Sequence, residues 1–217
     1  MEAIENCKWT GLQVVLAVTV ILGFNDQYLW EMIRFVVEQG LTGINFHAMA
    51  LSGRFSKLLM DSPNHCTQGH FLLQVEKQSE GKLLKSDFGT IPCPDHRCGL
   101  LSYILNQNGE LIPLKRLIRE DKLFDFVADL SDWETLLPQL AWDLAGTCGC
   151  FESSGIQKDL GTLLSRANFF SVGYHGMMEA WNFDVERARR CCVHKLTLDG
   201  KLMPFCLDNI KHRQKLR

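Results

Sequence analysis

The strongest constraint on the fold is an apolar run that is followed, at short distance, by a helical pattern and a second apolar run. Residues 12–22 are mostly apolar and rich in β-branched side chains, which is typical of a strand buried on both faces of a parallel sheet. A turn at 23–26 precedes a predicted helix over 27–39, and residues 44–49 form the next expected strand. The pattern therefore predicts a β–α–β unit and an α/β fold.

Turn and cap residues predict the elements that follow this unit. Asn25 or Asp26 is expected to cap the first helix and Thr67 a later one. The pairs Asn108-Gly109 and Asp199-Gly200 each predict a β-hairpin. The expected helices are 68–79, 120–129, 132–145 and 182–190, and the expected strand pairs are 100–106 with 110–117 and 192–198 with 201–206. Residues 146–168 carry no clear pattern.

Composition and charge narrow the classes of partner. The chain has 217 residues and a formal net charge of −2, so it lacks the basic field that attracts nucleic acid, and no nucleic-acid partner is expected. The longest apolar run, over 14–24, is shorter than the about 20 residues that span a bilayer, so no transmembrane segment is expected. Acidic residues precede that run, unlike a signal peptide, and a cytoplasmic location is expected.

Nine cysteines are many for such a chain, and clustered cysteines in a reducing compartment indicate metal binding or catalysis. Cys93 and Cys98 enclose four residues of a turn-forming segment. Cys191, Cys192 and Cys206 bracket the second hairpin, whose two strand bases must be neighbours. If the two hairpins pack side by side, Cys93, Cys98, Cys206 and either Cys191 or Cys192 supply four thiolates. Such a set suits a 4Fe-4S cluster or a zinc ion. Buried, inert cysteines are the alternative.

The two hairpins share a pattern: a cysteine enters the first strand, a turn glycine follows, and Leu-x-Pro lies on the return strand. This similarity indicates a weak internal repeat of a cysteine-presenting hairpin. Chance similarity between two small hairpins is the alternative. Cys66, Cys148 and Cys150 are not expected to bind the metal. His175 is flanked by glycines and can approach a ligand, but a surface loop is the favoured interpretation. His194 is interpreted as a neighbour of the metal ligands or as a residue packed on a strand face.

Several segments resemble radical SAM enzymes. Val14–Asp26 is similar to the fifth barrel strand and following turn of that family, and Gly43–Arg54 is similar to the sixth strand. Ile91–Gly99, Asn182–Cys192 and Asp199–Asn209 resemble the C-terminal region of one subgroup, which includes the tetraether lipid synthases and the pterin methyltransferase-like proteins.

The resemblance implies a fold and a division of the chain. Residues 1–62 are expected to be the remnant of a partial TIM-type (β/α) barrel, its last strands. Residues 63–217 are expected to be a small α+β auxiliary-cluster region with helices and two β-hairpins, similar to a SPASM domain. The distance from Gly200 to Cys206 is slightly longer than in that domain type.

The resemblance also implies site residues and cofactors. Val20, Gly23, Asn45 and His47 are expected at the SAM-facing ends of the last barrel strands, with S-adenosylmethionine as cofactor of the full-length parent. An auxiliary 4Fe-4S cluster is expected on the cysteines that bracket the hairpins: Cys93, Cys98, Cys206, and Cys191 or Cys192.

One departure from the family is decisive for activity. The C-x3-C-x2-C motif, which in the family holds the SAM-cleaving cluster, does not occur in the sequence. The chain is therefore expected to be the inactive C-terminal part of a radical SAM enzyme, completed by a missing N-terminal barrel half or an equivalent chain. The parent is expected to methylate or couple carbon atoms of a small-molecule or lipid substrate. The alternative is a stand-alone four-cysteine zinc or iron module without catalysis. Bound iron with sulfide favours the first, and zinc alone the second.

Overall fold

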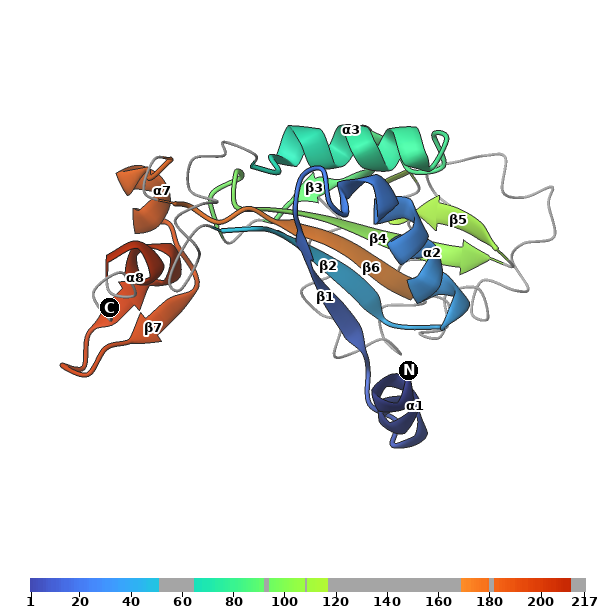
Figure 1. Ribbon diagram of the computed structural model, residues 1–217, viewed down its shortest axis with the longest axis horizontal. Coiled ribbons are helices and arrows are strands. Elements are labelled where there is room, and N and C mark those ends of the chain that lie inside the picture. Colours follow the sequence, from blue (N-terminus) through green and yellow to red (C-terminus); the bar gives the residue numbers. More distant parts are fainter. Residues whose placement is uncertain (51–64, 92–93, 108, 117–168, 180–181, 212–217) are drawn as a thin grey trace, which may run out of the picture.

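The computed structural model describes residues 1–50, 65–91, 94–107, 109–116, 169–179 and 182–211 (Figure 1). Its elements, in chain order, are α1 (Glu2–Trp9), β1 (Val15–Val20), η1 (Asp26–Tyr28), α2 (Leu29–Glu38), β2 (Gly43–Ala48), α3 (Gln68–Gln78), η3 (Lys85–Asp87), β3 (Gly89–Thr90), β4 (Gly99–Gln107), β5 (Glu110–Pro113), η4 (Leu114–Arg116), β6 (Phe169–His175), α7 (Val185–Arg189), β7 (His194–Leu196), β8 (Leu202–Pro204) and α8 (Phe205–Lys211). They form a six-stranded sheet with α2 and α3 on one face, and a small C-terminal unit of α7, β7, β8 and α8 at one end of it.

The large sheet has the strand order β1-β2-β6-β4-β3, with β5 also paired to β4. Strands β1, β2 and β6 are parallel, and β4 runs antiparallel to β6, β3 and β5. The predicted β–α–β unit is present: β1 leads into α2 and the chain returns as β2, with Val15 opposite Gly43. The mixed α/β class is thus confirmed.

Strand β1 differs from the sequence prediction in length and environment. It covers six residues rather than 12–22, and its exposure alternates along the strand instead of being low on both faces. The physical reason is its position: in the described part of the sheet β1 pairs with β2 alone, so one edge and one face lack neighbours. Val15 is 53% exposed, whereas Val20 is buried beneath the helices.

The turn after β1 also corrects a prediction. Neither Asn25 nor Asp26 makes a side-chain cap on the helix that follows. Asn25 instead bridges the end of β1, since its side chain accepts from the N–H of Ile21 at 2.7 Å and donates to the carbonyl of Thr19 at 2.9 Å. Asp26 accepts from the N–H of Gly23 at 2.7 Å. These contacts make a rigid turn at the carboxyl end of β1.

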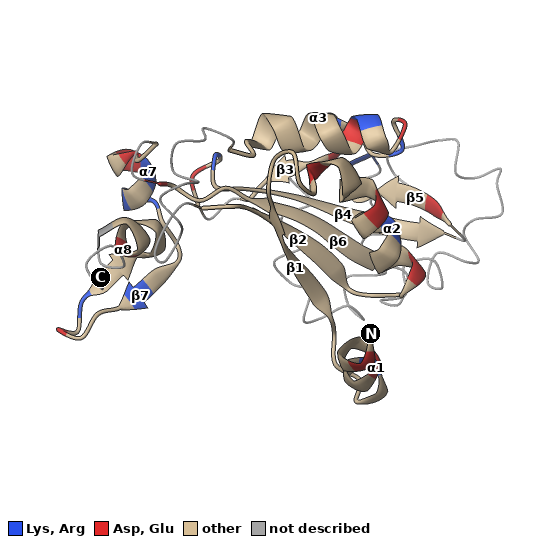
Figure 2. Cartoon of the chain, viewed as in Figure 1, with Lys and Arg blue, Asp and Glu red and all other residues tan. Residues whose placement is uncertain are grey.

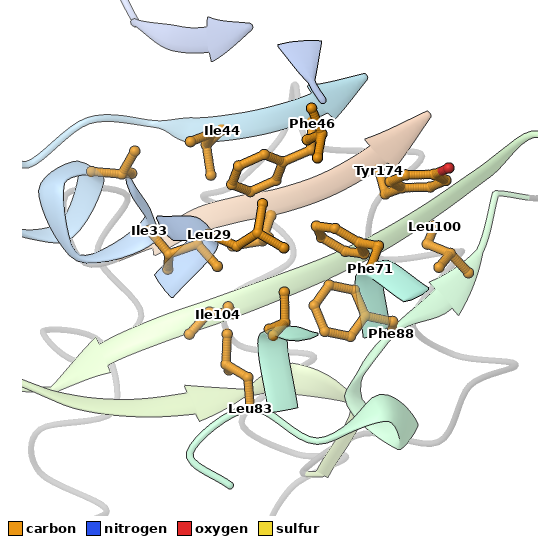
Figure 3. Packing of buried hydrophobic residues seen from close by; sticks show 14 of the residues in the cluster. Leu29, Ile33, Ile44, Phe46, Phe71, Leu83, Phe88, Leu100, Ile104 and Tyr174 are labelled. Carbon is orange, nitrogen blue, oxygen red and sulfur yellow. The ribbon is translucent and has the colours of Figure 1, made fainter. Parts of the chain in front are cut away.

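The core lies between the sheet and the two helices (Figure 3). Phe71 of α3 is fully buried, and its ring centroid lies 4.9 Å from that of Tyr174, 5.4 Å from that of Phe46 and 5.8 Å from that of Phe88. Thr67 caps this helix, as predicted, by accepting from a backbone N–H of its first turn at 3.2 Å. The aromatic cluster therefore joins α3 to β2 and β6.

Both predicted hairpins are present, with Gly109 and Gly200 at positive φ in their turns. They belong to different sheets: β4 and β5 extend the large sheet, and β7 and β8 form a separate two-stranded sheet. The predicted helix near 182–190 is α7, capped by Asp184. The predicted helices over 120–129 and 132–145 lie outside the described residues, as do Cys93, Cys148 and Cys150.

Strand β6 was not predicted, and it corrects the interpretation of His175. The segment 169–175 is a central strand between β2 and β4, and His175 is its last residue rather than part of a surface loop. Within the described part of the chain, no helix is long and apolar enough to cross a membrane.

We predict that Phe71→Ala lowers the free energy of unfolding by about 3–5 kcal/mol, because it removes a buried ring and leaves a cavity between α3 and the sheet. Urea unfolding followed by circular dichroism measures this. Leu73→Ala on the same helix is the control, since Leu73 is 55% exposed and its loss should change stability by no more than about 0.5 kcal/mol. Equal losses in the two variants would contradict the packing described here.

Candidate functional site

A cavity of about 400 Å³ lies between the sheet and the C-terminal unit. It opens at the carboxyl ends of the parallel strands β2 and β6, where ligands of open α/β sheets usually bind. Its described lining is mostly apolar, with the side chains of Ile91, Pro94, Met177, Met178, Val193 and Phe205. A mostly apolar cavity of this size with a few polar groups is typical of a small-molecule or cofactor site.

Three polar side chains form the wall that the sheet contributes: Asn45, His47 and His175. In the register of β2 with β6, His47 lies opposite His175 and Asn45 opposite Gly173. All three side chains project from the face of the sheet opposite α2 and α3, because the residues that alternate with them are the buried core residues of those strands. A side chain at Gly173 would clash, since a Cβ there would lie 2.8 Å from Oδ1 of Asn45.

The two histidines of this wall are neighbours, and their surroundings disfavour the charged form of each ring. Their ring centroids lie 5.8 Å apart. Burial lowers the pKa of His47 below its usual value of about 6.5, and burial together with the proximity of His47 and Arg187 lowers the pKa of His175. Each uncharged imidazole offers one donor and one acceptor. Among the described residues, neither ring nor the amide of Asn45 has a hydrogen-bond partner, so these groups are free to bind a ligand.

Four cysteines form a second wall of the cavity: Cys98, Cys191, Cys192 and Cys206. They come from three segments, namely the residue before β4, the link between α7 and β7, and the first turn of α8. The second hairpin brings two of these segments together, since the N–H of Phe205 donates to the carbonyl of Val193 at 3.0 Å. All the predicted metal cysteines among the described residues therefore line this one cavity. Their role as ligands stays a prediction.

The thiols have distinct surroundings. Sγ of Cys98 accepts from Nε of Arg187 at 3.0 Å, and Sγ of Cys206 accepts from the N–H of Met178 at 3.4 Å. The thiol of Cys191 donates to a backbone carbonyl two residues on, at 3.0 Å. Burial raises the pKa of the Cys206 thiol, and the nearby Cys191 and Cys98 act in the same direction, against the N–H of Met178 and the charge of Arg187. The cysteines are therefore close enough to influence one another.

This donor set suits either an iron–sulfur cluster or a zinc ion, because both take thiolate ligands. Among the described residues, which do not include Cys93, no group of three or more His, Cys, Asp or Glu side chains is placed to hold a metal ion.

An ionic network joins the loop of Cys98 to α7. The buried carboxylate of Asp95 accepts two hydrogen bonds from the guanidinium of Arg97, at 2.8 and 3.1 Å, and these bonds hold its pKa well below the usual range. The same guanidinium donates to Asp184 at 2.8 Å, and Asp184 in turn caps α7 by accepting from the N–H of Arg187 at 3.0 Å. Two segments almost 90 residues apart in sequence are thereby held side by side. Figure 2 shows this charge beside α7, whereas β1, β2 and β6 carry none.

The other predicted site residues lie elsewhere. Val20 is buried in the core beneath the helices, and Gly23 lies in the turn after β1 with its N–H bound by Asp26; neither lines the cavity. His194 is exposed on β7. The sequence interpretation missed Arg187, although a basic residue three positions after a capping aspartate is visible in the sequence.

No family model matches the chain. The chain is 28% identical, over 267 aligned residues, to 7,8-dihydro-6-hydroxymethylpterin dimethyltransferase of Methanocaldococcus jannaschii. The match covers 99% of this chain and 52% of that protein, so the chain spans about half the length of the curated relative it matches. The chain is similar to the pterin methyltransferase-like radical SAM proteins. The resemblance predicted from the sequence is thereby confirmed.

We predict that the cysteines of the metal-free protein differ strongly in reactivity. Burial, with a smaller effect of Asp26, raises the pKa of the Cys66 thiol from 9.0 to about 12, which reduces its thiolate fraction at neutral pH by roughly a thousandfold. Brief treatment with iodoacetamide, followed by mass spectrometry, should therefore modify the exposed Cys192 first and leave Cys66 and Cys206 unmodified. All should react in urea. Modification of native Cys66 as fast as Cys192 would contradict the structure.

Proposed function

We propose that this chain forms the last part of a radical SAM enzyme and holds its auxiliary 4Fe-4S cluster. One observation carries the proposal: cysteines from three separate segments meet at a cavity that also receives polar side chains from the ends of parallel strands. The ligands would be Cys98, Cys206, Cys93, and either Cys191 or Cys192. The cluster would supply electron transfer, while the protein binds and orients the molecule beside it.

The sheet supports the proposed barrel origin of the chain. Parallel strands with helices on one face and polar side chains at the carboxyl ends on the other are the local arrangement of a (β/α) barrel. We propose that 1–62 belongs to a partial barrel and 63–217 to an auxiliary-cluster region, although β6, from the second region, pairs with β2, from the first. The edge of β1 that has no partner strand among the described residues is the place where further barrel strands would add.

We further propose a methyl transfer to a small heteroaromatic molecule in the complete enzyme. The relative is named for a pterin, a flat ring with several donors and acceptors, and the uncharged groups of Asn45, His47 and His175 suit such a ring. S-adenosylmethionine would bind along the same strand ends, where Asn45 and His47 are the residues best placed to contact it, since both line the cavity. Val20 and Gly23 would affect its binding only through the backbone at the end of β1, since the Val20 side chain faces the core.

We predict that the protein, reconstituted anaerobically with iron and sulfide, binds both and absorbs broadly in the visible range. Cys98→Ala or Cys206→Ala should abolish this absorption, because each would remove one thiolate ligand from the cavity. Cys93→Ala is expected to do the same. Cys7→Ala and Cys66→Ala are matched controls, because both cysteines lie outside the cavity. Zinc binding without iron or sulfide would instead support the structural module, and loss in the control variants alone would refute the ligand assignment.

We also predict that the 217-residue chain alone produces no 5′-deoxyadenosine from S-adenosylmethionine, even with a strong reductant. In the family, that cleavage needs a cluster held by C-x3-C-x2-C, and the sequence contains no such motif. Liquid chromatography of anaerobic reactions measures the product, with a no-protein control. Product above that control would show that the chain holds a SAM-cleaving cluster by another route.

A further inference from the structure

Arg187 is a buried cation that points at the cysteine wall. It lies on α7, is 8% exposed and lines the cavity. Its Nε–H donates to Sγ of Cys98 at 3.0 Å, and a terminal N–H of the same guanidinium donates to the carbonyl of Gly176. Asp184 caps α7 by accepting a hydrogen bond from the backbone N–H of Arg187, so the backbone position from which this side chain extends is fixed.

Among the residues that the structure describes, the guanidinium of Arg187 has no carboxylate as counter-ion. Other arginines near the site are paired with carboxylates: Arg97 with Asp95 and Asp184, and Arg189 with Glu186. Among the described residues, no carboxylate pairs with the guanidinium of Arg187, and none lines the cavity. A guanidinium keeps its charge in proteins, so its burial is unfavourable unless negative charge lies close by. Among the described groups, the Cys98 thiol contacts the guanidinium and can carry that charge as a thiolate.

We propose that Arg187 raises the reduction potential of the auxiliary cluster by donating a charge-assisted hydrogen bond to the thiolate of Cys98. This inference rests on the proposed function, since it assigns a role to Arg187 toward the cluster. Hydrogen bonds to the sulfurs and the net charge around a cluster both set its potential. Arg187 is thus a positioning residue that supplies both effects from one side chain.

The direction of the expected shift in reduction potential follows from the charges involved. The cluster with its four thiolates is anionic, and it becomes more negative when it accepts one electron from a low-potential reductant; no bond forms or breaks and no proton is required. A fixed positive charge at 3.0 Å from a ligand sulfur stabilises the more negative, reduced form more than the oxidised form. Removing that charge therefore makes reduction harder.

The experiment is a redox titration of the reconstituted 217-residue protein, with the reduced cluster followed by electron paramagnetic resonance. Arg187→Gln should lower the equilibrium constant for reduction at least tenfold, which is a shift of about 59 mV to lower potential for one electron. Arg187→Lys keeps the charge but loses the planar N–H fork, so it should shift less. Arg189→Gln is the matched control: it removes the same charge from the same helix at an exposed position and should leave the potential unchanged.

The outcomes separate this inference from the proposed function. If the unchanged protein takes up no iron and sulfide, the proposed function fails, and this inference with it. If the cluster assembles and Arg187→Gln has the potential of the unchanged protein, or if Arg189→Gln shifts equally, the inference alone is overturned. Should Arg187→Gln fail to fold, Arg187→Lys decides, since an unchanged potential in that variant would overturn the role of the N–H···S bond. A purely structural role for Arg187 would change cluster yield without moving the potential.

Discussion

The parallel pairing of β2 with β6 determines both faces of the sheet, and the site depends on it. Side chains alternate along each strand, so this register puts Phe46 and Tyr174 into the aromatic core and His47 and His175 onto the opposite face. A slip of one residue would exchange the two sets. Gly173 permits the register, because a Cβ there would lie 2.8 Å from a side-chain oxygen of β2. Core packing under α3 therefore holds the polar wall of the cavity in place.

The second wall depends on electrostatics more than on apolar packing. The C-terminal unit has a small core of its own, and Arg97 joins it to the loop of Cys98 through carboxylates on both sides, Asp95 and Asp184. Asp95 is buried, so losing its partner would leave an uncompensated charge, which is strongly destabilising. Arg187 adds a second link between α7 and that loop. The described cysteines are thus held together by elements that lie far apart in the sequence.

Sequence signals predicted the features that depend on residues close together in the chain, such as turns and hairpins. The turn glycines Gly109 and Gly200 revealed both hairpins, and the base of the second hairpin correctly brought Cys206 toward the cysteines before β7. Strand 169–175 was missed even though its aromatic and β-branched residues favour a strand, because its place between β2 and β4 is set by contacts distant in sequence. Arg187 was missed for the same reason: only the fold brings it to a thiol, and no spacing in the sequence encodes that distance.

The two walls of the cavity differ in charge, and this difference limits what each can do. Burial, the proximity of His47 and the charge of Arg187 all oppose protonation of His175, and burial opposes protonation of His47, so the sheet wall favours uncharged imidazoles. In the proposed cluster the thiolates would carry the negative charge, and the guanidinium of Arg187 would compensate it at short range. An uncharged ring can then bind to the sheet wall without competing for that cation. In the proposed enzyme, the sheet wall would bind the substrate, and the cysteine wall would hold the cluster that transfers electrons.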